Sequence, residues 1–128
     1  MNHHGDQCPF CAIDPSRVVA GNALAFVIRD GFPVTVLHSL VIPRRHAAGY
    51  FDLTADEVRA CHELLGSSRL EIQKMDSSVV AFNVGINVGS AAGQTVNHCH
   101  IHLIPRREGD VPNPRGGIRH TIPGKGDY

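Results

Sequence analysis

The pattern of apolar and polar residues divides most of the chain into short strands around one helix. Near the N-terminus, apolar runs at residues 18–20, 24–28 and 35–42 have the β-branched and aliphatic composition of strands. Turn-forming residues at 29–33 separate the second run from the third, and this link is too short for a helical crossover. The pattern therefore predicts a hairpin or meander of antiparallel strands.

Residues 54–75 carry the pattern of one long helix. Thr54 and Glu57 have the spacing of a capping box, in which each side chain bonds to the backbone amide of the other. Apolar residues then recur at alternating steps of three and four, the spacing of a stripe that packs against a sheet. The stripe consists of Val58, Cys61, Leu65, Ile72 and Met75, with a gap at Ser68.

Two further strands are predicted after the helix, at residues 79–88 and 98–104. Strict alternation in the second places His98, His100 and His102 on one face of the strand and apolar residues on the other. Strands, then a helix, then more strands with short links predict an α+β domain, with one long helix and an antiparallel sheet of about five strands.

The length of 128 residues fits a single domain over residues 1–128. Residues 1–7 are polar, and we expect them to be a flexible N-terminus. Residues 106–128 are rich in glycine and proline, and we expect this tail to pack on the domain or on a dimer mate. The hydrophobic content of 42% is that of an ordinary globular protein.

Charge and hydropathy exclude several classes of partner. The 12 basic and 12 acidic side chains give a formal net charge of zero. A protein that coats nucleic acid normally carries a basic excess, so no nucleic-acid partner is expected. No run approaches the roughly 20 apolar residues of a membrane span, and the N-terminus lacks the regions of a signal peptide. We therefore expect a cytoplasmic protein without membrane association.

Histidine is the residue type whose count stands out, with nine in the chain. Histidine ligates metals and also serves as a nucleophile or in proton transfer. A solvated polar strand face is the simple explanation for the row at 98–102, but the intervening residues are apolar. A catalytic metal held by the row alone is disfavoured, because its first and last positions lie about 13 Å apart on a strand. The row therefore favours phosphate chemistry.

Residues 98–104, His-Cys-His-Ile-His-Leu-Ile, resemble the motif of the histidine triad (HIT) superfamily. The similarity includes the Gly-Gln-Thr sequence at 93–95 and the stretch at 38–46, and it covers about residues 8–110. The resemblance implies a HIT-like fold and a homodimer whose sheets are joined. It also implies a nucleotide-binding site in which the substrate is cleaved at its α-phosphorus.

The resemblance implies a role for each residue of this site. His100 attacks phosphorus and forms a covalent nucleotidyl intermediate, His102 contacts the phosphate oxygens, and His38 supports the triad that His98 begins. The nucleotide is expected to contact Asp30 through its ribose, Asn87, Gly93, Gln94 and Thr95 through its phosphates, and Phe10, Ile13 and Ile28 through its base. Relatives usually have Pro-Gly where this chain has Val36 and Leu37, so the shape of that loop is open.

Cys8 and Cys11 form a second candidate site, because a spacing of two residues lets both sulfurs face one tetrahedral ion. A pair of reduced thiols without metal is the alternative. A redox pair is disfavoured, since no βαβ pattern surrounds the cysteines. Some bacterial members of the superfamily bind structural zinc with such a pair and two histidines, and the resemblance implies that His46 and His98 complete this site.

The sequence therefore predicts a HIT-type nucleotide hydrolase or nucleotidyl transferase. Residues 105–110 resemble the dinucleoside polyphosphate hydrolases, which implies substrates such as diadenosine tetraphosphate. Arg107, Arg115 and Arg119 are either contacts for the extra phosphates or ordinary surface arginines. An adenosine phosphoramidate hydrolase and a dinucleoside polyphosphate phosphorylase share the same mechanism and stay open. A non-catalytic, zinc-containing nucleotide-binding module is an alternative of another class.

Overall fold

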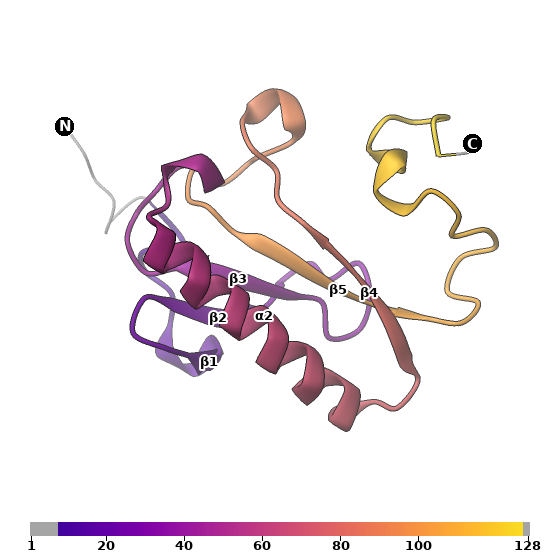
Figure 1. Cartoon of the computed structure of the whole chain (residues 1–128), viewed down its shortest axis with the longest axis horizontal. Helices are drawn as coiled ribbons and strands as arrows, with labels where there is room; N and C mark the ends of the chain where they lie inside the picture. The colour runs from indigo at the N-terminus through magenta and orange to yellow at the C-terminus, as the bar shows by residue number, and fades with distance from the viewer. Residues whose placement is uncertain (1–7, 127–128) are drawn as a thin grey trace.

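A five-stranded antiparallel sheet forms the framework, and one long helix covers one of its faces (Figure 1). The computed structural model describes residues 8–126, so the flexibility predicted for residues 1–7 lies outside the described part. The strands are β1 (Val18–Gly21), β2 (Ala25–Arg29), β3 (Ser39–Pro43), β4 (Val79–Gly85) and β5 (Ile101–Arg107), in the order β1-β2-β3-β5-β4. The long helix is α2 (Ala55–Met75), and the short 3-10 turns are η1 (Pro15–Arg17), η2 (Tyr50–Asp52), η3 (Ser90–Ala92) and η4 (Gly117–Thr121). The predicted α+β fold class is confirmed.

Helix α2 begins at the predicted capping box. Thr54 Oγ1 accepts from the Glu57 amide at 3.1 Å, and Glu57 Oε1 accepts from the Thr54 amide at 2.9 Å. The buried stripe differs from the predicted one, because it runs mainly at steps of four and includes Ser68. Met75, predicted to be buried, is 56% exposed at the end of the helix. The buried helix residues are Glu57, Ala60, Cys61, Leu64, Ser68 and Ile72.

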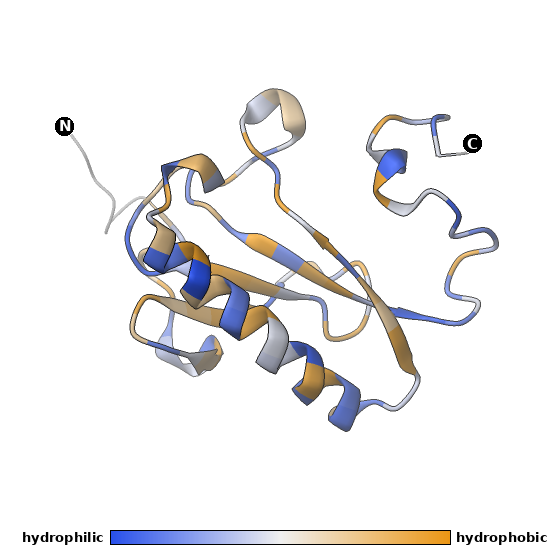
Figure 2. Ribbon diagram, viewed as in Figure 1, coloured by the Kyte–Doolittle hydropathy of each residue, from blue (hydrophilic) through white to orange (hydrophobic). Residues whose placement is uncertain are grey.

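Strand alternation divides the core into two layers. One cluster lies between α2 and the sheet and joins Ala25, Val27, Val41 and Ile101 to helix residues. The other lies on the opposite face and consists of Phe26, Ile28, Leu40 and Ile42, against which Phe10 and Ile13 pack. Figure 2 shows β2 and β3 as mainly apolar, whereas α2 mixes polar and apolar residues as expected of a helix with one exposed side. The N-terminal segment therefore covers part of the sheet face that α2 leaves open.

The third and fifth strands start later than the sequence predicts. The predicted strand at 35–42 begins at Ser39, because a turn in which the His38 amide bonds to the Thr35 carbonyl at 3.1 Å precedes it. The predicted strand at 98–104 begins at Ile101, so only His102 of the three alternating histidines lies in β5. The histidines still lie opposite the apolar residues, because His100 and His102 line one cavity and the Phe10 ring meets the rings of His98 and His100. Ile101 and Leu103 instead join the core clusters that include α2 residues.

The C-terminal segment runs along the edge strand β4. Arg106 donates to Asn83 Oδ1 of β4 at 2.7 Å and forms an ion pair with Asp110 at 2.8 Å. Further on, a Cβ atom on Gly85 would lie only 3.3 Å from Ile118 Cδ1, so η4 approaches the strand closely. No helix in the described part of the chain is long and apolar enough to cross a membrane.

Candidate active site and metal centre

A cavity of about 410 Å³ opens on the sheet face that α2 leaves uncovered, and it brings together most of the predicted catalytic and nucleotide-binding residues. Those that line it are Phe10, Asp30, Asn87, Gly93, Thr95, His100 and His102. His38 lies directly behind His102, with its Nε2 atom 3.0 Å from His102 Nδ1. The residues that line the cavity come mainly from the N-terminal segment, the loop before β3 and the loop before β5, and these three segments are far apart in the sequence.

The hydrogen bonds of His38 and His102 assign their protons. The Val34 amide donates to His38 Nδ1 at 3.1 Å, so His38 carries its proton on Nε2. This proton is directed at His102 Nδ1, with Asp30 Oδ2 also within 3.4 Å of the same nitrogen. His102 Nδ1 is thus an acceptor, and a neutral His102 carries its proton on Nε2.

Burial keeps this pair of imidazoles neutral. Desolvation lowers the pKa of His38, and the nearby Asp30 carboxylate opposes that shift. Desolvation also lowers the pKa of His102, as do the neighbouring His100 and His38 rings. At pH 7 the pair therefore offers one N–H donor to an anion rather than a full positive charge.

His100 has the opposite tautomer. Its Nδ1 atom donates to the main-chain oxygen of His98 at 2.8 Å, which leaves the lone pair of a neutral ring on Nε2. The ring is 8% exposed and packs at 5.3 Å from the His102 ring. An imidazole with a free lone pair, next to an imidazole that can donate, can attack a phosphorus atom whose oxygens the neighbour binds.

The turn that carries His38 holds its preceding residue in an unusual conformation. Leu37 has φ +72°, the only positive φ of a non-glycine residue in the described chain. The resemblance to the histidine triad superfamily implies a glycine at this position, and the leucine adopts a conformation that favours glycine. Its side chain packs against Ile72, Val79 and Leu103, which compensates part of the strain.

Three predicted nucleotide-binding residues do not line the cavity. The Gln94 side chain donates to the Ala48 and Val96 carbonyls, at 2.6 and 3.0 Å, and accepts from the Gly89 amide. It therefore braces the loop that presents Gly93 and Thr95. Ile28 is fully buried beneath the cavity floor, and Ile13 packs on the same apolar cluster.

Several residues that line the cavity were not predicted as site residues, among them Arg17 and Phe32. Arg17 lines the cavity and donates to the Arg29 carbonyl at 3.3 Å, and Phe32 lies at the mouth with 92% of its surface exposed. The turn composition around Gly31 gave no sign of a binding wall. A single exposed aromatic residue is common on protein surfaces, so the sequence carried no specific signal for Phe32.

The arginines considered for phosphate binding have structural partners. Arg107 donates to Asp76 Oδ2 at 2.9 Å and to the Val36 carbonyl at 3.0 Å, so it ties the end of α2 to the turn before His38. Hydrogen bonds from Ser78 and Arg107 lower the pKa of Asp76 to about 2. Arg119 donates to the Lys125 carbonyl within the C-terminal segment. Arg107 is thus a brace for the loop rather than a wall of the cavity.

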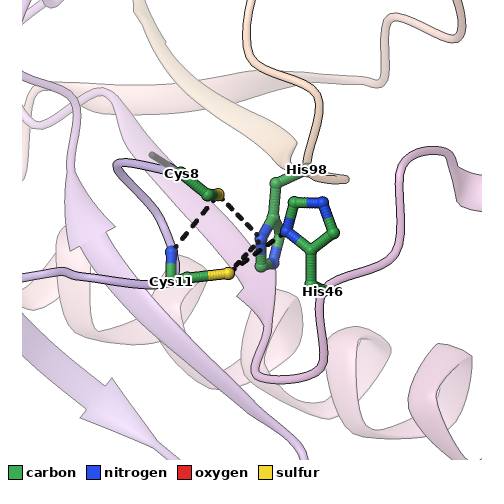
Figure 3. A group of neighbouring side chains, drawn as sticks. All are labelled: Cys8, Cys11, His46 and His98. Atoms are coloured by element: carbon green, nitrogen blue, oxygen red, sulfur yellow. Dashed lines mark hydrogen bonds between the residues drawn. The ribbon is translucent and has the colours of Figure 1, made fainter. Parts of the chain in front are cut away.

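Cys8, Cys11, His46 and His98 converge beside the cavity (Figure 3). Cys8 Sγ lies 3.3 Å from His98 Nδ1, and Cys11 Sγ lies 3.5 Å from the same atom and 3.1 Å from His46 Nδ1. A tetrahedral zinc ion with ordinary bond lengths separates sulfur and nitrogen ligands by about 3.6 Å. The donor set and its spacing therefore fit zinc after shifts of a few tenths of an ångström.

The surroundings of this cluster also suit a metal. His98 Nε2 donates to the Pro43 carbonyl at 2.8 Å, which leaves the Nδ1 lone pair directed at the two sulfurs. Burial, with Cys8 nearby, raises the pKa of the Cys11 thiol to about 11, so the thiolate form requires a cation beside it. Cys61 and Cys99 lie apart as buried core residues, and burial raises the pKa of their thiols to about 11 and about 12.

The fold, the histidine cluster and the neighbouring donor set are those of a histidine triad protein. The model of the HIT domain family matches residues 13–109, and the chain belongs to this family. An uncharacterised HIT-like protein of Mycoplasma pneumoniae is 35% identical over 107 residues, which cover 80% of this chain and 74% of that protein. The bifunctional bis(5'-adenosyl)-triphosphatase/adenylylsulfatase FHIT of Arabidopsis thaliana is 36% identical over 77% of this chain and 54% of its own length.

Solved structures share the same fold. A HIT family protein from Bacillus anthracis has a TM-score of 0.74 and 34% identity, over 80% of this chain and 74% of the other. A Zn-bound histidine triad family protein from Mycobacterium smegmatis has a TM-score of 0.75 and 32% identity, over 81% of this chain and 78% of the other. Some relatives are thus named as nucleotide hydrolases, and one solved relative is named as zinc-bound.

Proposed function

We propose that this protein is a nucleotide hydrolase or nucleotidyl transferase that cleaves dinucleoside polyphosphates at the α-phosphorus through a nucleotidyl-His100 intermediate. The observation that carries the proposal is the hydrogen bond from His100 Nδ1 to the His98 carbonyl, which leaves the Nε2 lone pair of His100 for attack. The name of the Arabidopsis relative, a triphosphatase acting on a bis(5'-adenosyl) compound, supports this substrate class.

The chemistry takes two steps. In the first, His100 Nε2 forms a bond to the α-phosphorus while the bond from phosphorus to the bridging oxygen breaks, and the remaining phosphate chain leaves. The His98 carbonyl, which holds the Nδ1 proton, stabilises the positive charge that develops on the His100 ring. In the second step water attacks phosphorus, the P–N bond breaks, and a nucleoside monophosphate and a proton are released.

Two neighbouring groups support these steps. The Nε2 proton of His102 is donated to a non-bridging phosphate oxygen, and His38 fixes that tautomer from behind. Asp30 lies beside the same His38 nitrogen that faces His102, lines the cavity, and presents a carboxylate to the ribose hydroxyls. Neutral donors suit a phosphate diester better here than buried cations, because they bind the charge without holding the product tightly.

A product assay distinguishes the proposal from its nearest alternatives. The protein is incubated with diadenosine tetraphosphate or adenosine phosphoramidate, each with and without inorganic phosphate, and the products are separated by chromatography. AMP from the tetraphosphate supports the hydrolase, and ADP formed only with phosphate indicates a phosphorylase. Turnover of the phosphoramidate alone indicates the other hydrolase. No turnover of either compound would overturn the enzymatic proposal in favour of a nucleotide-binding module.

We also propose that Cys8, Cys11, His46 and His98 hold one structural zinc ion. The sulfur and nitrogen spacing supports this assignment, and so does the zinc-bound relative from Mycobacterium smegmatis. Zinc bound there ties the N-terminal segment to the loop after β3 and to the segment before β5. Metal analysis of the purified protein tests the assignment, and a content far below one zinc per chain contradicts it.

A homodimer with joined sheets is the assembly we propose. Strand β4 is an edge of the sheet, so its outer backbone groups face no other strand within residues 8–126. Val80 and Val84 on this strand are 56% and 51% exposed. Sedimentation equilibrium measures the assembly directly, and a monomeric mass at micromolar concentration would refute it.

A further inference from the structure

Two contacts connect the Cys8–Cys11 centre to the nucleophile. The first passes through His98, whose ring faces the cysteine sulfurs while its main-chain oxygen accepts the Nδ1 proton of His100 at 2.8 Å. The His98 ring is fully buried and is fixed on its other side by the Pro43 carbonyl. The residue that offers a ligand to the metal thus also sets the orientation and tautomer of the His100 ring.

The second contact passes through Phe10, which lies in the turn between the two cysteines. Its ring meets His100 edge-on, with centroids 5.0 Å apart and an interplanar angle of 69°. It also meets His98 at 6.0 Å and 83°. The same ring lines the cavity that holds His100, His102 and Asp30. The turn that supplies two metal ligands therefore also supplies a wall of the nucleotide site.

Polar contacts attach the turn to the rest of the protein through its two sulfurs. Inside the turn, the Ala12 amide donates to the Cys8 carbonyl at 3.2 Å and the Cys11 amide donates to Cys8 Sγ at 3.4 Å. Toward the rest of the site, the two sulfurs contact His46 and His98. These contacts, together with the packing of Phe10 on the apolar cluster of the sheet, hold the turn in place.

We propose that metal binding at the Cys8–Cys11 centre and nucleotide binding in the cavity reinforce each other, with Phe10 as the positioning residue that couples them. This inference rests on the proposed function, because it requires that the cavity takes a nucleotide. A bound nucleotide packs against Phe10 and holds the turn closed over the metal. A bound metal holds Phe10 against His100 and completes the cavity wall. Thermodynamic linkage requires that the nucleotide changes the metal affinity by the same factor as the metal changes the nucleotide affinity. Such couplings between protein sites are typically about 5- to 150-fold.

The test measures zinc transfer and nucleotide affinity rather than turnover. Zinc-loaded protein is equilibrated with the chromophoric chelator 4-(2-pyridylazo)resorcinol, and the extent of zinc transfer, measured with and without saturating AMP, gives the zinc dissociation constant. Titration calorimetry gives the AMP dissociation constant of the zinc-loaded and the metal-stripped protein. We expect AMP to lower the zinc dissociation constant at least ~5-fold, and removal of zinc to weaken AMP binding by the same factor.

Variants separate coupling from general loosening of the segment. Phe10→Ala should keep one zinc per chain but abolish the effect of AMP on zinc transfer, and Phe10→Tyr should restore it. Ile13→Ala is the matched control, because Ile13 packs on the same apolar cluster but does not line the cavity. At saturating AMP the Ile13 variant should still show reduced zinc transfer.

The possible failures are distinct. AMP binding with an unchanged zinc dissociation constant overturns the coupling and leaves the proposed function intact. Unchanged coupling in Phe10→Ala overturns the role of Phe10. Protein that takes up no zinc but binds AMP overturns the coupling and the zinc assignment and leaves the proposed nucleotide chemistry intact. Absence of AMP binding to the zinc-loaded protein overturns both the coupling and the proposed nucleotide chemistry.

Discussion

Replacement of Leu37 tests whether its left-handed backbone conformation stores strain. Ala is normally more stable than Gly by roughly 0.5–1 kcal/mol in a folded chain, because Gly loses more conformational freedom. At φ +72° this order should reverse, because a residue with a Cβ atom carries about 1–2 kcal/mol of strain there. The balance predicts that Leu37→Gly is more stable than Leu37→Ala by about 0.5–1 kcal/mol.

Both variants lose the contacts of the Leu37 side chain with Ile72, Val79 and Leu103, so this term cancels in their difference. Because the side chain is half-buried, each variant should be less stable than the parent protein, by roughly 1–2 kcal/mol for the glycine. Urea unfolding at 25 °C, followed by circular dichroism, gives the free energies. Equal stabilities, or an alanine variant more stable than the glycine variant, would refute the strain argument.

Further outcomes concern the triad, its protonation and the metal. His100→Ala should abolish turnover of diadenosine tetraphosphate and leave AMP affinity, measured by calorimetry, within an order of magnitude; retained turnover excludes the His100 intermediate. Burial lowers the pKa of His38 and His102, so the unfolded chain binds more protons below about pH 6.5, and the free energy of unfolding should decrease from pH 7 to pH 5. His38→Gln should reduce that pH dependence in urea titrations, and an unchanged dependence would assign it to other groups. Cys11→Ser should lower zinc content well below that of the parent protein and reduce the melting temperature, and a variant that keeps its full zinc content removes Cys11 from the ligand set.

Local signals in the sequence were sufficient for several features. The capping box of Thr54 and Glu57 is confirmed, because such a cap depends only on residues within one helical turn. The family resemblance brought His46 and His98 to the Cys8–Cys11 pair, and the structure places these four side chains together. A spacing pattern alone does not give that assembly, since the ligands lie up to 90 residues apart.

Other features depended on tertiary contacts that no local pattern encodes. The alternation at 98–104 predicted a strand from His98, but the Cys99 amide bonds to the Ala47 carbonyl at 2.7 Å, and the strand begins only at Ile101. The role of Arg17 in the cavity wall was missed for a similar reason. Its position follows from how the segment before β1 packs beside Asp30 and Gly31, which sequence spacing does not specify.

The four free cysteines lie in two different settings, so labelling of their thiols distinguishes local opening of the N-terminal turn from unfolding of the whole domain. Cys61 and Cys99 are each 1% exposed, and their thiols are protonated in the core at neutral pH, so a maleimide reagent reaches them only when the whole domain unfolds. Cys8 is buried and Cys11 is partly exposed, and both become fully available when the N-terminal turn separates from the sheet. Intact mass spectrometry after pulsed labelling should therefore resolve two populations: chains with two labels count local openings, and chains with four labels count global unfolding events. The stability of one turn and that of the entire fold can be read from a single wild-type sample.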